Sequence, residues 1–322
     1  MTKPLLSMKN VSIIYPGERG DVCAVRNVSL DVAPGETLGL VGESGSGKSS
    51  LASAMLGLLP AGARIEGSVH FEDRELTALG EDERRRLRGS AIAAIAQDPF
   101  TALNPVLRIG RQMVAFQHCH REMSKAQRWR RAIDMLEKVG LSDPETRMRQ
   151  FPHQLSGGSR QRVAIGAALL AEPRLLIADE PTTALDATTE AQILAIMRDA
   201  KAGFTGATVF ITHDISVVSR VCDRVAVLYA GELLETGPVS AVLANPQHPY
   251  TKALLECDPA RIDRPTRTLP IIPGTVPAPT EPRNGCSFAP RCRSAFGPCA
   301  TERPPLAACG RDWNSACHLV TA

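Results

Sequence analysis

The segment Gly42–Ser49, with the sequence GESGSGKS, has residue types and a spacing that suit the binding of phosphate. Its glycines permit a tight loop whose N–H groups point inward at phosphate oxygens, and Lys48 adds a positive charge. Ser49 offers a hydroxyl ligand for Mg²⁺. An apolar run before the loop, Thr37–Val41, predicts a buried strand, and a helix is expected over Leu51–Leu59. This context favours a nucleotide site over a chance glycine-rich turn.

Further polar residues follow apolar runs later in the chain. The run Leu175–Ala178 predicts a strand that ends in Asp179, a suitable Mg²⁺-associated carboxylate, and Glu180, which can orient an attacking water as a general base. Gln97 and His213 each follow another apolar run, and ligands gather at the carboxyl ends of strands in open α/β sheets. Alone, either residue is as easily read as an ordinary surface residue.

Two more segments have a chemical and a structural interpretation. Ser156, Gly157 and Gly158 open a helical pattern whose free N–H groups and dipole can bind an anion, although an ordinary serine N-cap explains the same residues. Tyr15 ends the first strand-like run, where its flat ring can stack on adenine or simply close the strand.

These segments, taken in order, make the chain similar to the ATP-binding subunit of ABC transporters over about Leu5 to Leu255. The resemblance rests on the phosphate loop, the glutamine loop, the LSGG signature, the Asp-Glu pair, the loop that ends at Asp186 and the switch histidine. It implies an ATPase in which Glu180, His213 and Gln97 are catalytic. It also implies that ATP is sandwiched between two subunits.

The same resemblance implies that Ser49, Gln97 and Asp179 hold Mg²⁺. The residues expected to bind ATP are Tyr15, Gly42, Ser44, Gly45, Ser46, Gly47, Lys48, Ser49, Ser50, Gln97, Ser156, Gly157, Gly158, Asp179 and Asp186.

Composition limits the class of protein. The 322 residues carry a net charge of +3, too little and too dispersed to indicate nucleic-acid binding. The densest basic run, 84–88, follows three acidic residues and is typical of a solvated helix face. No stretch approaches ~18 consecutive apolar residues, and the N-terminus lacks a long apolar signal segment. We therefore expect a peripheral protein at the cytoplasmic face of the inner or plasma membrane.

The expected fold class is α/β, a P-loop NTPase of ABC type with a parallel core sheet. Residues 1–256 form the ATPase domain, with an N-terminal antiparallel β region and a helical subdomain over about 98–160. Ser124 and Gln127 predict a capping box in that subdomain. Residues 257–285 are a proline-rich connector, and 286–322 are a small Cys-rich C-terminal extension.

The extension concentrates cysteine, with five of the nine cysteines in the last forty residues. In a reducing compartment such a cluster favours a metal or cofactor over disulfides, and a segment with little core of its own gains from a metal staple. The spacing alone does not choose between iron–sulfur and zinc. The five are Cys286, Cys292, Cys299, Cys309 and Cys317.

A narrower resemblance, to the dipeptide/oligopeptide/nickel branch of ABC importers, rests on three segments. These are DPFTALNP after Gln97, HPY at 248–250, and GCSFAPRC at 285–292. It implies a [4Fe–4S] cluster on Cys286, Cys292, Cys299 and Cys317, with zinc as the second choice and plain thiols as the third. Cys309 falls outside the pattern but can compete with Cys317.

The branch implies that this chain hydrolyses ATP to power the import of dipeptides or oligopeptides. Its expected partners are a second, different ATPase subunit, two transmembrane permease subunits and an extracytoplasmic substrate-binding protein. Nickel or opine import is the alternative within the branch. A soluble ABC ATPase that acts on nucleic acid or ribosomes, and a redox-sensing module centred on the cysteines, are the alternatives outside it.

Overall fold

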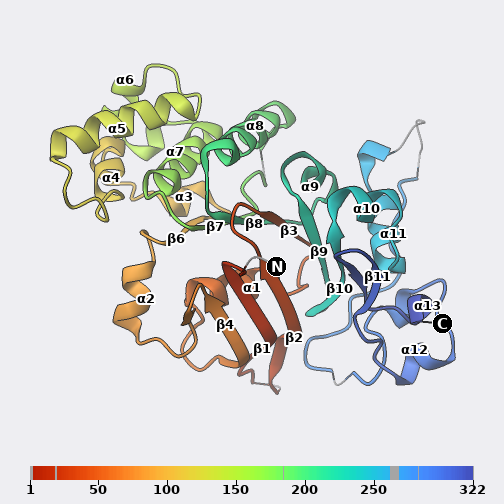
Figure 1. The fold of residues 1–322 in the computed structure, drawn as a ribbon. Helices are drawn as coiled ribbons and strands as arrows, with labels where there is room; N and C mark the ends of the chain where they lie inside the picture. The colour runs from red at the N-terminus through yellow and green to blue at the C-terminus, as the bar shows by residue number, and fades with distance from the viewer. Residues whose placement is uncertain (1–2, 19, 184, 262–267, 282, 322) are drawn as a thin grey trace. The chain divides into compact units, whose positions relative to one another are not determined.

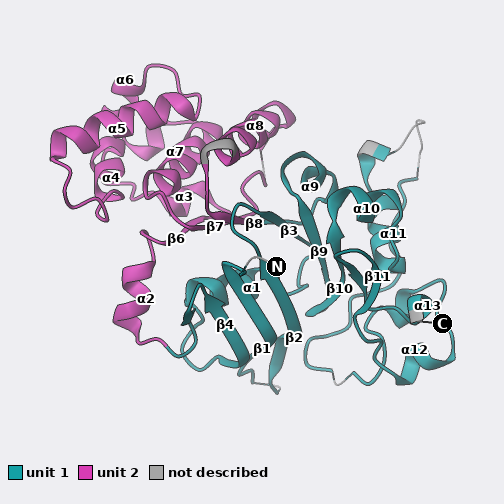
Figure 2. Ribbon diagram, viewed as in Figure 1, with its two compact units in different colours: residues 1–78, 210–322 teal, residues 79–209 magenta. Residues whose placement is uncertain are grey.

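The computed structural model of the protein describes residues 3–18, 20–183, 185–261, 268–281 and 283–321. The chain divides into two compact units, residues 1–78 with 210–322 (unit 1) and residues 79–209 (unit 2), as Figure 2 shows. The strand β8 (Ala207–Thr212) contains the boundary between them.

The N-terminal part of unit 1 is a four-stranded antiparallel sheet in the order β2-β1-β4-β5 (Figure 1). In β2, Val28, Leu30 and Val32 are buried and the residues between them are exposed, which is the alternation that a strand with one covered face requires. The strands are β1 (Leu6–Tyr15), β2 (Val22–Val32), β4 (Arg64–Phe71) and β5 (Arg74–Glu75).

The core strands of unit 1 surround the strand that leads into the phosphate loop. That strand, β3 (Thr37–Val41), is buried at all five positions and pairs in parallel with β9 (Arg224–Tyr229). β9 in turn pairs antiparallel with β10 (Glu232–Pro238). The helices of this part are α1 (Lys48–Leu56), α9 (Ile215–Val221), α10 (Val239–Ala244) and α11 (Pro249–Glu256), followed by a 3-10 turn, η2 (Pro259–Arg261).

The C-terminal residues of unit 1 add two short strands to this sheet, because β12 pairs antiparallel with β10 and with β11. Phe288 is buried against Tyr229 and Tyr250, with both ring-centroid distances at 5.3 Å. The segment therefore shares the core of unit 1. Its elements are η3 (Ala289–Arg291), α12 (Gly297–Thr301), β11 (Ala307–Gly310), β12 (Trp313–Ser315) and α13 (His318–Thr321).

Unit 2 contains the parallel pair β6 (Ile92–Ile95) and β7 (Leu175–Asp179) together with most of the helices. The predicted capping box is present at the start of α5, where the Ser124 hydroxyl accepts from the Gln127 N–H and the Gln127 side chain accepts from the Ser124 N–H. The helices are α2 (Glu81–Leu87), α3 (Pro99–Ala102), α4 (Ile109–Ala115), α5 (Lys125–Lys138), α6 (Pro144–Arg149), η1 (Pro152–Gln154), α7 (Gly157–Leu170) and α8 (Ala187–Gly203).

The helix after the phosphate loop differs slightly from the predicted one. It begins at Lys48, inside the motif, and ends at Leu56 because Gly57 adopts a left-handed conformation with φ 62°. Within the described ranges, no helix combines the length and apolar character that crossing a membrane requires. Residues 262–267 of the expected connector lie outside the described residues, and the domain boundaries at 256 and 285 stay predictions.

Candidate functional site

The phosphate loop in unit 1 is organised around a buried lysine. The Lys48 ammonium donates to the carbonyl oxygens of Gly42 at 2.7 Å and Glu43 at 2.9 Å, and to the Ser46 hydroxyl at 3.3 Å. Only 6% of Lys48 is exposed. The loop thus holds a positive charge at its centre on oxygen atoms that phosphate oxygens can replace.

Two glycines make this tight loop possible. A Cβ at Gly42 would lie 2.1 Å from the Leu228 carbonyl oxygen, and one at Gly47 would lie 2.6 Å from the Ala24 carbonyl oxygen. Gly47 also has φ 98°, in the left-handed region that favours glycine. Any side chain at these two positions would push the loop away from the neighbouring strands.

The other unit 1 residues of the predicted site lie at the ends of strands. Tyr15 is the last residue of β1, and its hydroxyl donates to the Ser50 hydroxyl in α1 at 3.1 Å. Ser49 is exposed at the start of α1. His213 directly follows β8 and is exposed, and the next residue, Asp214, caps α9.

In unit 2 the structure brings together Gln97 and Glu180. Oε2 of Glu180 accepts from the Gln97 amide at 3.1 Å and from the Thr183 hydroxyl at 2.8 Å. Glu180 has φ 46°, a left-handed conformation that is uncommon for a residue with a side chain and is often found at functional sites. The carboxylate is therefore oriented by two donors directly after the end of β7.

The signature segment begins a helix next to this acid. Ser156 caps α7, because its hydroxyl accepts from the Ser159 N–H at 3.3 Å. The buried Gln161 in α7 donates to the Pro181 carbonyl oxygen at 2.8 Å, one residue after Glu180. The serine N-cap interpretation is correct for this structure, and the hydrogen bond of Gln161 fixes the helix against the loop that follows Glu180.

Asp186 stabilises the start of α8 and holds Thr189, which lies against Gly158 of the signature segment. Its carboxylate accepts from the N–H groups of Thr188 and Thr189 and from the Thr189 hydroxyl, and these bonds lower the pKa of the Asp186 carboxyl. A Cβ at Gly158 would lie 2.6 Å from the Thr189 methyl group. Gly158 therefore permits the close approach of α7 to α8.

Four of the five C-terminal cysteines line one small cavity in unit 1. Cys286, Cys292, Cys299 and Cys317 surround about 10 Å³ beside Phe288, while Cys309 is not part of the lining. All four are free thiols, and burial raises the pKa of Cys286 to about 11. Among the residues that the structure describes, no group of three or more His, Cys, Asp or Glu side chains is arranged to hold a metal ion.

Comparison with known proteins agrees with this geometry. The family model described as ABC transporter matches residues 25–183, and the model described as Oligopeptide/dipeptide transporter, C-terminal region, matches residues 234–299. The Oligopeptide transport ATP-binding protein OppD of Escherichia coli is 45% identical over 302 residues, which cover 94% of this chain and 89% of that protein. The chain belongs to the ATP-binding subunits of ABC transporters, in the oligopeptide/dipeptide branch.

Two further relatives extend the comparison for this ABC ATPase. The Probable D,D-dipeptide transport ATP-binding protein DdpD of Escherichia coli is 44% identical and covers 98% of this chain and 96% of that protein. The solved dimeric ATP-binding cassette MJ0796, in a post-hydrolysis state bound to ADP and Pi, is 30% identical with a TM-score of 0.65. It covers 73% of this chain and 98% of that one. The predicted α/β ABC ATPase is thereby confirmed.

Sequence reasoning missed three of the residues that organise the site. Gln161 and Thr183 have ordinary sequence contexts, and only the fold shows that they bond to the loop of Glu180 or to its carboxylate. Arg291 stands in a segment that carries the branch resemblance, but that segment gave no signal for its partner in the phosphate loop. Such partners are determined by tertiary packing and leave no local pattern.

Proposed function

We propose that this ABC ATPase hydrolyses ATP to power the import of dipeptides or oligopeptides through a membrane transporter. The observation that carries the proposal is the buried Lys48 at the centre of a glycine-lined phosphate loop, in a chain that matches oligopeptide transport ATP-binding proteins over nearly its full length. Substrate choice belongs to the partner subunits. The names of the relatives support peptides over nickel or opines.

The residues divide the work as follows. Lys48 and the N–H groups of Gly45, Ser46 and Gly47 bind the phosphates, and Tyr15 contacts adenine. Hydrogen bonds to the charged phosphates are charge-assisted and are about twice as strong as hydrogen bonds between neutral groups. The ATP-binding set also includes Gly42, Ser44, Ser50 and Asp186.

Glu180 orients the attacking water and accepts its proton, while Gln97 holds the carboxylate in place. His213 stabilises charge that develops on the transferred phosphoryl group. Ser49, Gln97 and Asp179 would hold Mg²⁺, which supplies positive charge to the phosphate oxygens. The N–H groups at Ser156, Gly157 and Gly158 are offered to the ATP of a second ATPase subunit, which we expect to be a different chain.

We further propose that the subunit works at the cytoplasmic face of the membrane, bound to two permease subunits that receive substrate from an extracytoplasmic binding protein. Helical residues of the 98–154 region are the proposed docking surface. Co-purification from detergent-solubilised membranes tests this assembly. Recovery of the chain with ribosomes or nucleic acid, and without any permease, would contradict it.

The ATPase assignment is tested by Lys48→Ala. Loss of the ammonium group at the centre of the loop should greatly weaken ATP binding and abolish hydrolysis, measured by nucleotide titration and phosphate release. Lys9→Ala, at an exposed lysine of β1, serves as the matched control and should hydrolyse ATP at the wild-type rate. Unchanged hydrolysis in Lys48→Ala would contradict the assignment.

We also propose that Cys286, Cys292, Cys299 and Cys317 hold a [4Fe–4S] cluster, with zinc as the second choice. The shared cavity supports this, because it selects the four cysteines of the branch and leaves out Cys309. The cavity of about 10 Å³ is the size of one water molecule, so the thiols must turn and move apart around any bound group. The cluster would tie the extension to the rest of unit 1 and take no part in ATP chemistry.

A further inference from the structure

Glu43, the second residue of the phosphate loop, is bound to a residue of the C-terminal segment. Nη1 of Arg291 donates to Oε2 of Glu43 at 2.7 Å, and Nη2 donates to Oε1 at 3.2 Å. The Arg291 side chain is only 4% exposed and that of Glu43 is 28% exposed. A two-point guanidinium–carboxylate bond in such a setting is strong and fixes the direction of both side chains.

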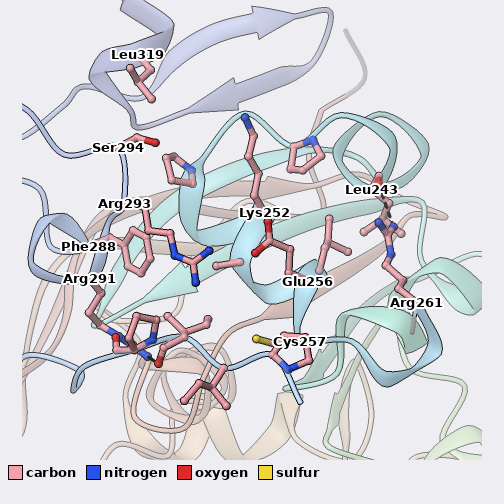
Figure 3. Close-up of a pocket in the computed structure, with 18 of the residues that line it drawn as sticks. Leu243, Lys252, Glu256, Cys257, Arg261, Phe288, Arg291, Arg293, Ser294 and Leu319 are labelled. Atoms are coloured by element: carbon pink, nitrogen blue, oxygen red, sulfur yellow. Dashed lines mark hydrogen bonds between the residues drawn. The ribbon is translucent and has the colours of Figure 1, made fainter. Parts of the chain in front are cut away.

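Arg291 is held rigidly from its own side. Its guanidinium donates to the carbonyl oxygens of Pro273 at 2.9 Å and Ile272 at 3.0 Å, and to the Tyr229 hydroxyl at 3.3 Å. The nearby Glu43 carboxylate raises the pKa of Arg291. Figure 3 shows Arg291 beside Phe288 and Arg293 on the wall of a cavity of about 810 Å³. The guanidinium is therefore positioned before any nucleotide binds.

Glu43 also forms hydrogen bonds through its backbone, one of them with the lysine that is expected to bind phosphate. Its N–H donates to the Tyr250 hydroxyl at 3.0 Å, and its carbonyl oxygen accepts from Lys48 at 2.9 Å. Arg291, Tyr250 and Lys48 thus bind three different groups of one loop residue. Glu43 therefore links Arg291 of the C-terminal segment to Lys48 at the centre of the phosphate loop.

The charge of Glu43 creates a difficulty that Arg291 resolves. A carboxylate in a loop that must receive a triphosphate repels the ligand, and this repulsion is strong where burial excludes water. With Arg291 bound, the pair is neutral. Without Arg291, the same carboxylate would be free to oppose the nucleotide or to draw Lys48 away from it.

We propose that Arg291 is a positioning residue for ATP binding, which neutralises Glu43 and holds it away from the nucleotide's phosphates. The inference deepens the proposed function and rests on it for the identity of the ligand. Arg291 acts only through Glu43 and does not touch ATP. The C-terminal segment therefore contributes to the affinity of the phosphate loop.

A charge-cancelling cycle in the full-length chain tests this proposal. Titration with a fluorescent ATP analogue should show that Arg291→Ala raises the Kd about tenfold. Glu43→Gln should stay within about threefold of wild type, because the amide carries no charge. The double variant should also return to within about threefold, since the carboxylate that opposes the ligand is gone.

A merely structural arginine gives the opposite pattern. If Arg291 only fastened the segment, the double variant would bind no better than Arg291→Ala, and that result would overturn the proposal. Arg303→Ala is the matched control, because Arg303 lies in the same segment and pairs with Glu232 at 3.6 Å without contacting the loop. Its Kd should equal that of wild type.

Two further outcomes are separable. Should Arg291→Ala yield no folded protein, the Kd for the ATP analogue is measured with Arg291→Lys instead. The retained charge predicts a Kd within about threefold of wild type, and a tenfold increase would overturn the proposal. A wild-type chain that shows the predicted cycle of ATP binding, but whose complex with the second ATPase subunit fails to hydrolyse ATP, would contradict the proposed function alone. Normal hydrolysis with no effect of Arg291→Ala on the Kd would contradict only the inference.

Discussion

At the scale of single residues, the site depends on side chains that are held before ligand arrives. Lys48 is fixed by three acceptors of its own loop, and the Glu180 carboxylate is fixed by Gln97 and Thr183. The left-handed backbone at Glu180 costs of the order of 1 kcal/mol or more, and the surrounding bonds offset that cost. Preorganisation of this kind lowers the reorganisation needed during catalysis.

The role of Glu180 is tested by Glu180→Gln. The amide oxygen can still accept from Gln97 and Thr183, so the fold and ATP binding should be retained. Hydrolysis should fall at least ~100-fold, the scale of a lost general base, in a steady-state phosphate-release assay. Glu137→Gln, at an exposed position of α5, is the control. Near wild-type hydrolysis in Glu180→Gln would show that another group activates the water.

At the scale of elements, buried polar residues join β10, α11 and β12. Glu235 of β10 is fully buried and accepts from the indole N–H of Trp313 and from the N–H groups of Gln247 and His248. Nδ1 of His248 accepts from the Tyr250 N–H and so caps α11. These bonds help to explain how the C-terminal segment, which has little apolar content, is held against the rest of unit 1.

The buried histidine makes this part of the fold sensitive to acid. Burial lowers the pKa of His248 to about 3, below its ordinary value of about 6.5. The stability that depends on neutral His248 is therefore fully present above about pH 6.5 and is lost as the pH falls toward 3. At pH 5.5 the loss is of the order of 1 kcal/mol.

His248→Asn checks this, because asparagine can still cap α11 but does not titrate. In chemical denaturation between pH 7.5 and 5.5, the free energy of unfolding should fall more for wild type than for the variant. Equal losses over this range would mean that His248 is protonated in the folded state or that other groups dominate the acid response.

The cysteine cavity gives a second prediction for an element. Because burial raises the pKa of the Cys286, Cys292 and Cys317 thiols, a bound metal must displace protons, and metal content should increase with pH. Iron and sulfide analysis of anaerobically purified protein should show that Cys292→Ser loses the metal and that Cys309→Ser keeps it. Stoichiometric zinc would favour a zinc site over the [4Fe–4S] cluster. Metal-free thiols in the wild type would contradict the proposal of a metal site.

Local patterns predicted the elements that carry chemistry, and packing determined the rest. The GESGSGKS spacing located the phosphate loop, and Ser124 with Gln127 located the start of α5. The bond between Arg291 and Glu43 joins residues 248 positions apart, so no periodicity or motif indicates it. Likewise, spacing left Cys309 as a competitor of Cys317, and only the fold separates them by placing one in the cavity.

At the scale of the whole molecule, each unit carries some of the residues that the sequence predicts for ATP binding or hydrolysis. Lys48, Tyr15 and His213 belong to unit 1, while Gln97 and Glu180 belong to unit 2. The proposal of an ATP sandwich adds a second subunit, and the proposal of import adds the membrane partners. In this proposal, ATP hydrolysis is coupled to transport through the contacts of this chain with the second ATPase subunit and with the membrane partners.

Peptide uptake by the reconstituted transporter tests the central claim most directly. The complex that co-purifies with this chain would be placed in liposomes with its binding protein, and uptake of a labelled tripeptide would be measured with ATP at the ATPase face. We predict uptake with wild type and none with Glu180→Gln, although both complexes assemble. Equal uptake by both, or uptake without ATP, would contradict the account.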